Sequence, residues 1–353
     1  MPSLPSQKYS TIYLVKHKNL GIMAIRITTT QIVEALERNE KKQQPKAPNN
    51  IKEREAMFYI AVGQKGIGKT YTTLNLIDNY VKGNPKVGMK GRKVLIFDVN
   101  NEYTQYKEIA SDANTIARFS VQKVVEARRI SCMKGGKVKG MEDFKKDLNC
   151  ILANFRGGLL VLEDLALIVG DAQSVDFIGS LSTNRHRDMD IITHFQSIAK
   201  FTNPKMYALK NILRLHKTAD SCERPRPKAN LQDDYDIVRI GEIIVNNRFA
   251  TGVREMERLR SEGKQGSDEY KKYDNDYRRF HLTINFDTHK ITGAFSRQEF
   301  DDACEQFLQS EKARDIEKLS KQKDRHGNLM YENYEKAFNK FFDELSLYYV
   351  NKK

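Results

Sequence analysis

The feature of this sequence that most restricts its fold is the run VGQKGIGKT at residues 62–70. It fits the pattern G-x-x-x-x-G-K-[ST], in which the backbone N–H groups of a glycine-rich loop surround phosphate groups. The run MFYIAV before it is typical of a buried strand, and TYTTLNLIDNYV after it is typical of a helix, whose N-terminus adds positive potential. A ligand-free Gly/Lys turn is the alternative, but strand, loop and helix together favour a nucleoside triphosphate site.

Two side chains of this loop have specific expected roles. Lys69 would reach the β- and γ-phosphates, and the hydroxyl of Thr70 would bind Mg²⁺. We therefore expect ATP and Mg²⁺ as cofactors. The other expected nucleotide contacts in and beside the loop are Gly63, Gln64, Lys65, Gly66, Ile67, Gly68 and Tyr71.

Short apolar runs alternate with helical patterns from residue 56 to about residue 217. After MFYIAV the expected strands are KVLIFD, GLLVLE, DIITHF and NILRLH. This alternation predicts an α/β fold in which helices flank a mostly parallel sheet. Ligands bind such sheets at the carboxyl ends of the strands.

The rest of the chain is expected to add an N-terminal extension and a charged helical C-terminal region. Residues 1–50 hold a strand (STIYLVKH), a capped helix (TTTQIVEALERNEKK) and a polar linker (QQPKAPNN). Residues 51–300 form the nucleotide-binding domain, with a loop at CERPRPKANLQDD, helices over 233–275 and a hairpin through RFHLTINF and KITGAF. Residues 301–353 form a helical tail.

Composition restricts the partners and the compartment. Sixty Lys and Arg against 46 Asp and Glu give a formal charge of +14, which favours a polyanion, with nucleic acid preferred over a membrane surface. The four cysteines are far apart and form no C-x-x-C pair, so we expect a reducing, cytoplasmic location without zinc or disulfides. No apolar run approaches the length of a membrane span.

Two acids directly follow the apolar residues of the strand in GLLVLEDLAL. In a phosphate-loop protein the acid at such a strand tip normally holds Mg²⁺, and the next acid polarises the attacking water. The order here is Glu163 and then Asp164, so by position Glu163 takes the metal side and Asp164 the base. The inverted order leaves a swap of these two roles open, as well as a plain pair of solvated acids at a helix start.

Two further stretches are similar to a known superfamily. KVLIFDVNNEYTQY ends a strand in Asp98 and places Glu102 four residues later, and NRHRDMDIITHFQS places Arg185 eleven residues before Gln196. Over residues 56–217 the chain resembles the FtsK/HerA superfamily of DNA-pumping P-loop ATPases. The Arg-His pair and its spacing to glutamine also resemble viral genome-packaging ATPases and the phage proteins similar to zonula occludens toxin.

The resemblance implies a RecA-like (ASCE) P-loop fold and roles for these residues. Gln196 would sense the γ-phosphate or orient water, and Arg185 would reach the site of a neighbouring subunit. Asp98 and Glu102 would lie at the nucleotide, although both fit plain turn acids. His194 is interpreted as a packed histidine. Assembly into a hexameric or pentameric ring follows from the same resemblance.

The stretch QKVVEARRISCMKGGKVKGMEDFKKD is a candidate DNA-binding segment. A basic mobile loop of this kind would contact DNA phosphates without reading bases, and a solvated surface insertion is the equal alternative. The five cations expected to contact DNA are Arg128, Arg129, Lys134, Lys137 and Lys139.

The leading hypothesis is an ATP-driven DNA translocase, with viral or phage genome packaging as its task and a capsid or portal protein as a docking partner. The lack of a membrane span argues against membrane-anchored pumps and secretion proteins. A HerA-like DNA-processing motor that acts with a nuclease is the second hypothesis. A nucleotide-gated assembly protein with little hydrolysis is the third.

Overall fold

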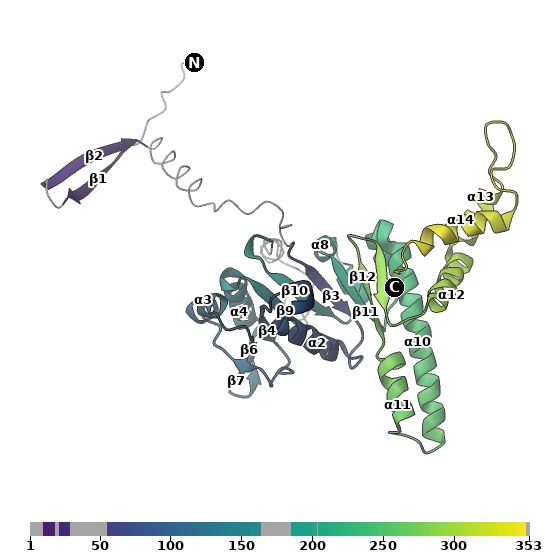
Figure 1. Ribbon diagram of the computed structural model, residues 1–353, viewed down its shortest axis with the longest axis horizontal. Helices are drawn as coiled ribbons and strands as arrows, with labels where there is room; N and C mark the ends of the chain where they lie inside the picture. Colours follow the sequence, from purple (N-terminus) through teal and green to yellow (C-terminus); the bar gives the residue numbers. More distant parts are fainter. Residues whose placement is uncertain (1–9, 18–20, 29–54, 164–184, 203, 351–353) are drawn as a thin grey trace. The chain divides into compact units, whose positions relative to one another are not determined.

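The structure is a computed structural model that describes residues 10–17, 21–28, 55–163, 185–202 and 204–350. The chain forms two compact units, Met1–Arg54 and Glu55–Lys353. In the first unit, β1 (Ser10–His17) and β2 (Gly21–Thr28) pair as antiparallel strands (Figure 1). The strand expected at STIYLVKH is thereby confirmed, whereas the remainder of the expected helix and the linker, residues 29–50, lie outside the described residues.

A nine-stranded sheet in the described residues organises the second unit, in the order β13-β12-β11-β3-β10-β9-β4-β6-β5. Pairing is parallel from β11 to β5, and β12 and β13 extend the sheet from β11 as antiparallel strands. The mostly parallel sheet, its five expected strands and the expected hairpin are confirmed. The strands are β3 (Phe58–Val62), β4 (Lys93–Asp98), β5 (Lys107–Glu108), β6 (Ala127–Ser131), β9 (Gly158–Leu162), β10 (Asp190–Phe195), β11 (Ile212–His216), β12 (His281–Asn285) and β13 (Lys290–Gly293).

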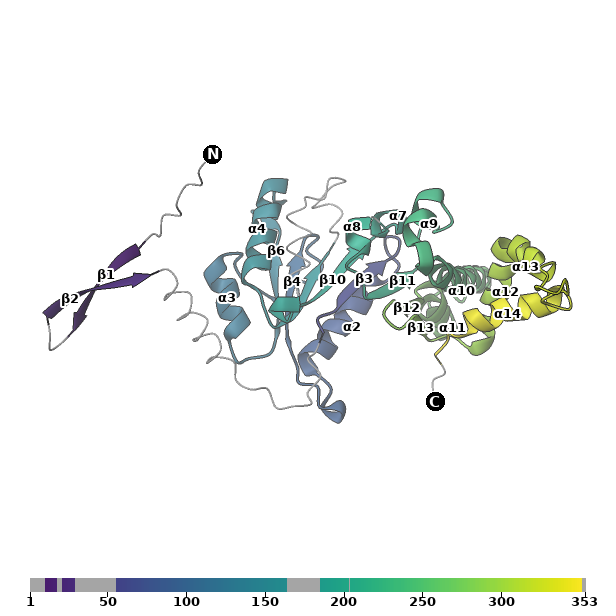
Figure 2. The ribbon, with the colours of Figure 1, turned by 90° about the horizontal axis from the view of Figure 1, so that it is seen from above.

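Helices cover both faces of the sheet (Figure 2). Successive side chains of a strand point to opposite faces, and β4 shows this clearly. Leu95 and Phe97 belong to the core that includes Phe144 of α4 (Met141–Asn154), together with side chains of α3 (Ala113–Val121). Val94 and Ile96 belong to the core under α2 (Lys69–Lys82). Apolar runs such as KVLIFD are therefore continuous because both of their faces are buried.

The basic stretch after α3 is not the mobile loop that the sequence suggested. It forms β6, a small hairpin of β7 (Met133–Lys134) and β8 (Lys137–Val138), and then α4. β6 pairs with β4, and Ile130 is 1% exposed. The burial of this part of the stretch within the sheet fixes it in place.

The segment between β11 and β12 is largely helical. It contains α9 (Pro225–Leu231), the 3₁₀ turn η3 (Gln232–Asp234), α10 (Tyr235–Ser261), α11 (Asp268–Lys272) and the π-helical turn η4 (Tyr273–Arg278). The helices expected over 233–275 are confirmed, but the loop expected at CERPRPKANLQDD is wrong. Proline is tolerated in the first turn of a helix, where its missing N–H has no intrahelical partner, and Pro225 begins α9 in this way.

After β13, helices α12 (Arg297–Phe307), α13 (Ala313–Ser320) and α14 (Tyr334–Ser346) follow, with the π-helical turn η5 (Leu308–Lys312) after α12. α12 packs on α10 (Figure 1), and Phe300 and Phe307 are fully buried in the core. Residue 300, an expected domain boundary, lies inside α12, and the domain boundaries stay a prediction. The remaining short turns and helices are η1 (Pro85–Val87), η2 (Arg185–Arg187), α7 (Ile198–Phe201) and α8 (Pro204–Tyr207).

Over the described ranges, no helix combines the length and the apolar character needed to cross a membrane.

Candidate nucleotide-binding site

The phosphate loop, residues 63–68, joins β3 to α2 at the carboxyl edge of the parallel strands. The backbone N–H of Gly63 donates a hydrogen bond to the carbonyl of Phe195, at the end of β10, over 3.0 Å. A Cβ atom at Gly63 would lie 2.6 Å from Cβ of His216. Because real Cβ contacts are never that short, a larger residue here would push the loop away from β11.

Lys69 begins α2 and directs its ammonium back into the phosphate loop. Its Nζ donates to the carbonyl oxygens of Gly63 over 2.6 Å and of Gln64 over 3.0 Å. The N-cap residue, Gly68, has no side chain to cap the helix, and a helix N-terminus of this kind suits an anion. The loop therefore combines a cation, a helix N-terminus and backbone donors at one place.

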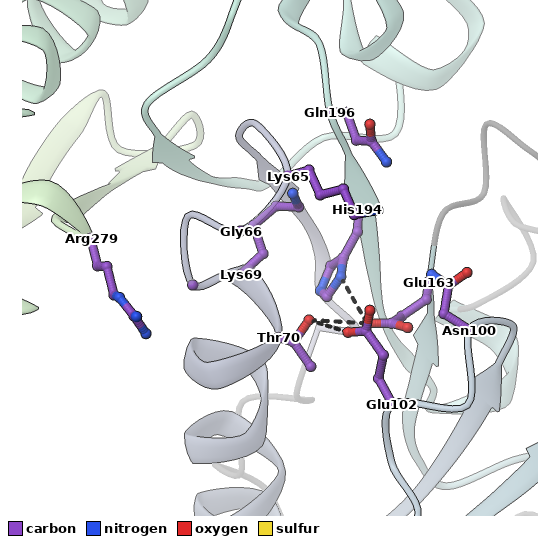
Figure 3. A pocket seen from close by; sticks show the side chains of 11 residues that line it. Lys65, Gly66, Lys69, Thr70, Asn100, Glu102, Glu163, His194, Gln196 and Arg279 are labelled. Carbon is purple, nitrogen blue, oxygen red and sulfur yellow. Dashed lines mark hydrogen bonds and ion pairs between the residues drawn. The ribbon is translucent and has the colours of Figure 1, made fainter.

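A cavity of about 710 Å³ opens at this loop (Figure 3). This volume is in the range of sites for small ligands. Most of its wall comes from the phosphate loop, the first turn of α2 and the carboxyl ends of β4, β9 and β10. Arg279, directly after η4, completes the wall. The lining residues are Lys65, Gly66, Gly68, Lys69, Thr70, Asn100, Glu102, Glu163, His194, Gln196 and Arg279. The sequence had singled out all of them as site residues except Asn100, His194 and Arg279.

The Thr70 hydroxyl lies between two carboxylates. Its Oγ1 is 2.7 Å from Oε2 of Glu102 and 3.4 Å from Oε1 of Glu163 (Figure 3). Hydroxyl and carboxylate oxygens are the ligands that Mg²⁺ prefers, and proteins usually bind this ion through one or two carboxylates together with substrate phosphates. In the described part of the chain, no group of three or more His, Cys, Asp or Glu could hold a metal alone. Thr70 and Glu163 thus fit an ion shared with phosphates.

Glu163 is the buried acid of the pair, with 2% of its surface exposed. The Tyr103 hydroxyl donates to its Oε1 over 3.0 Å, and Nδ1 of His194 is 3.6 Å from the same atom. Burial and the Glu163 carboxylate raise the pKa of Tyr103 well above its ordinary value, so the hydroxyl remains a donor. Oε2 of Glu163 has no hydrogen-bond partner within the described residues. A buried carboxylate oxygen without a partner is costly, and a cation would satisfy it.

His194 was interpreted as a packed histidine, and the structure gives it a place in the cavity as well. Its Nε2 is 2.9 Å from the Thr73 hydroxyl, and the ring is 2% exposed. Side chains two residues apart on a strand share a face, so His194 and Gln196 lie on the same side of β10. Strand alternation counted back from Gln196 could therefore have identified this residue.

Asp98 does not line the cavity and acts through its neighbours instead. Its carboxylate accepts the backbone N–H of Glu102 over 2.9 Å and that of Tyr103 over 3.2 Å, and it pairs with Arg129 at 3.0 Å. Asp98 is fully buried. The expected direct nucleotide contact is corrected: Asp98 holds the turn that presents Glu102 and Tyr103.

Five other predicted site residues do not line the cavity or lie wholly or partly outside the described part of the chain. Gln64 and Ile67 belong to the loop without lining the cavity, and Ile67 is 1% exposed. Tyr71 is 65% exposed on α2. Asp164 lies outside the described residues, and for Arg185 only the backbone, at the start of η2, is described.

The basic residues proposed for DNA differ in their surroundings. Arg128 pairs with Glu126 at 2.6 Å, Arg129 also pairs with Glu108 at 3.0 Å, and Lys139 pairs with Asp147 at 2.7 Å. Lys137 is exposed on β8, and the side chain of Lys134 is not described. The DNA contacts stay a prediction, and Lys137 is the best placed of the four described side chains.

The family model of the central domain of helicase HerA matches residues 61–174. It covers the phosphate loop, the β4 turn and the acid at the end of β9. Residues 61–174, which hold the phosphate loop, are therefore similar to the central domain of HerA-like P-loop ATPases. In this HerA-like protein, β10 lies between the loop strand β3 and the acid strand β9, and Gln196 directly follows it, as the resemblance implied.

Solved structures with some likeness include a genome-packaging NTPase, B204 of Sulfolobus turreted icosahedral virus 2, in complex with AMP. It is 12% identical, with 67% of this chain and 96% of that chain covered and a TM-score of 0.38. The N-terminal domain of zonular occludens toxin from Neisseria meningitidis is 13% identical, covering 46% and 76%, with a TM-score of 0.27. The ATPase DotB of Legionella pneumophila is 11% identical, covering 67% and 65%, with a TM-score of 0.28. Among curated proteins none matches this chain.

Proposed function

We propose that this HerA-like protein hydrolyses ATP to move DNA, that it works as a homo-oligomeric ring, and that its task is the packaging of a viral genome. One observation carries the proposal: the ammonium of Lys69, the Thr70 hydroxyl and the buried Glu163 carboxylate meet in one cavity at the carboxyl edge of the sheet. These are the groups that phosphoryl transfer from a nucleoside triphosphate requires.

Several residues of the cavity, together with Asp164, have steps in this reaction. Lys69 and the N–H groups of the phosphate loop bind the phosphates and offset their charge. Thr70 and Glu163 would hold Mg²⁺, which supplies positive charge at the β- and γ-phosphates. Gln196 orients the attacking water, and Asp164, the acid after Glu163, accepts its proton. Glu102, 2.7 Å from Thr70, is the further acid on this wall of the cavity.

The polymer partner is DNA, bound through its phosphates without reading of the base sequence. The formal charge of +14 and the match to a helicase domain support a nucleic acid partner. The spacing of Arg185 to Gln196 resembles genome-packaging ATPases and HerA-like motors alike, so DNA processing beside a nuclease stays the second candidate. A capsid or portal protein would dock the ring.

The decisive experiment measures ATP turnover with and without double-stranded DNA, together with the assembly mass in a non-hydrolysable ATP analogue. We expect turnover that DNA stimulates and a nucleotide-dependent ring. Assembly with negligible turnover would replace the translocase by a nucleotide-gated assembly protein. Turnover that DNA leaves unchanged would remove DNA movement from the proposal.

The ring is tested by mixing two inactive variants. If Arg185 serves a neighbouring subunit, Arg185→Ala chains should bind ATP but hydrolyse it slowly. Mixing them with Lys69→Ala chains creates junctions that pair an intact phosphate loop with an intact arginine. Single-turnover activity should then recover above the assembly concentration. Inactivity of every mixture would place the arginine within its own subunit.

A further inference from the structure

The phosphate cavity leaves the nucleoside half of ATP without an obvious surface. Its lining is charged, polar or glycine, and His194 is the aromatic ring among the described lining residues. That ring is already engaged with Thr73 and Glu163. A purine base buries its faces against apolar or aromatic groups, which are what cofactor sites usually offer. The base therefore needs a surface beside this cavity.

A second cavity of about 830 Å³ lies beside the first, between η4 and the hairpin β12–β13. Its wall contains aromatic rings, small residues and hydroxyls in one place. Tyr277 and Phe280 supply the rings, Gly293 and Ala294 the small residues, and Thr283 and Thr292 the hydroxyls. The polar and charged residues of the wall are Arg248, Lys272, Asn275, Asp276, Arg279 and His281. Rings and small residues beside hydrogen-bonding groups suit a ligand that joins an aromatic base to a polar sugar.

Two contacts join the second cavity to the phosphate loop. Arg279 lines both cavities, and its Cβ would be 3.7 Å from a Cβ atom built on Gly68. His281, which also lines the second cavity, stacks on His216 with ring centroids 4.8 Å apart. His216 in turn is the residue against which Gly63 packs. The two cavities therefore share one wall residue and are supported by the same pair of strands, β11 and β12.

We propose that this second cavity binds the nucleoside moiety, a purine base and its ribose, of the nucleotide whose phosphates occupy the phosphate loop. Arg279 marks the boundary between the phosphates and the nucleoside. The inference rests on the proposed function, because it assigns the remaining half of the same ligand.

Arg279 can turn toward a bound nucleotide without leaving an isolated charge behind. Its Nε is 2.9 Å from Oδ2 of Asp274, and its side chain is 42% exposed. Asp274 also pairs with Arg278 through Oδ1. When Arg279 moves to a phosphate, Arg278 still neutralises Asp274, so the exchange leaves no unpaired carboxylate.

The turn that carries these residues is held by a close approach to α10. A Cβ atom at Gly252 of α10 would lie 2.8 Å from the backbone nitrogen of Arg278 and 2.8 Å from Cβ of Tyr277. Arg248, one helical turn before Gly252 and itself part of the cavity wall, lies over the rings of Tyr277 and Phe280, with distances of 5.3 and 4.5 Å to the ring centroids. η4 is therefore fixed by packing, and its wall of the cavity is preformed.

The first test compares ATP with inorganic tripolyphosphate, which has the phosphates but no nucleoside. Ala294→Trp fills the cavity from an exposed position on the hairpin, and Thr288→Trp places the same ring at the exposed turn of that hairpin. We expect Ala294→Trp to weaken ATP binding about 10-fold or more and to leave tripolyphosphate binding unchanged. Thr288→Trp should change neither affinity. Arg279→Ala should weaken both probes.

Unchanged ATP affinity in Ala294→Trp, or equal losses for both probes, would overturn the subsite while leaving the phosphate loop intact. Binding of neither probe by the unmodified chain would overturn the proposed function and the subsite together.

The second test needs no variant. Photolysis with 8-azidoadenosine triphosphate should attach the label within residues 273–294. Labelling confined to α2 or to the segment after β10 would overturn the assignment.

Discussion

The two sides of the nucleotide cavity differ in how the chain builds them. The phosphate side comes from the carboxyl ends of the parallel strands β3, β4, β9 and β10 and from the loops and first helical turn that follow them. The opposite side comes from Arg279, which follows a long helical excursion and precedes an antiparallel strand. The family match ends at residue 174, so it includes most of the first side and none of the second.

The two sides differ in how general their task is. Phosphate binding is common to many nucleotide-binding sheets, whereas the wall opposite is particular to this chain. Phosphate binding needs a fixed loop, a cation and an acid, and a parallel sheet brings these together at one edge. Recognition of the rest of the ligand needs only a suitable wall, which any element next to that edge can supply. Variants on the phosphate side should therefore affect all nucleotides alike, and variants on the other side should discriminate between ligands.

The largest effect is expected at Lys69. Lys69→Ala should lower ATP affinity or turnover by about 100-fold or more, because a charge-assisted contact to the phosphates is lost. Calorimetric titration and a phosphate-release assay measure the two quantities. Lys65→Ala is the matched control, since Lys65 is an exposed lysine of the same loop, and it should cost much less. Equal effects would show that the loop attracts phosphate only by its net charge.

The second effect separates the acids of the phosphate side. Glu163→Gln should weaken Mg²⁺-dependent ATP binding more than Glu102→Gln, because Glu163 is buried and Glu102 exposed. Asp164→Asn should instead lower kcat by about 100-fold, since a group that activates water acts in the transition state. Binding titrations at several Mg²⁺ concentrations and turnover assays distinguish the cases. If Glu163→Gln lowered turnover but bound ATP and Mg²⁺ normally, Glu163 would be the base and Asp164 the Mg²⁺ ligand.

The third prediction concerns the histidine under the second cavity. Burial, with the nearby charge of Arg214, lowers the pKa of His281 to about 4. Between pH 6.5 and 4 the unfolded chain therefore binds a proton that the folded chain does not. Stability should fall as the pH decreases, by up to about 3 kcal/mol for this residue.

Urea unfolding at pH 7, 6 and 5 measures that slope. His281→Phe keeps a ring against His216 and should reduce the pH dependence. The pKa of His216 is also lowered well below its ordinary value by burial, so part of the slope should remain. An identical slope in both proteins would contradict the assignment to His281.

The smallest effect is expected for DNA binding. Lys137→Ala should reduce the slope of log K against log salt by about 1, because one phosphate contact is lost. Arg129→Ala should leave the slope unchanged, since Arg129 is committed to Asp98 and Glu108. Fluorescence anisotropy over a salt series tests both. If Arg129→Ala alone changed the slope, the DNA path would run along β6.

Local signals in the sequence were sufficient for the sheet and for the phosphate side of the site. Apolar runs such as KVLIFD mark strands because both faces are buried, and the acid Glu163 directly follows β9. Local signals did not predict the structure where it depends on which strands pair with one another in the sheet. Arg128 and Arg129 looked like cations of a loop, but β6 joins the sheet beside β4. Nothing near Arg279 in sequence indicates a phosphate loop, because their proximity depends on β12 pairing with β11.

That pairing also determines when the site can form during folding. β11 and β12 are neighbours in the sheet, and His216 lies opposite His281, yet residues 217–280 separate them in sequence. Helices such as α10 form from local contacts within microseconds, whereas strand pairing across so long a segment must overcome the entropy of closing it. The parallel strands can assemble earlier, but the support behind Gly63 is completed only when β12 docks. Competence to bind nucleotide should therefore appear as a late event in refolding, after most of the secondary structure is present.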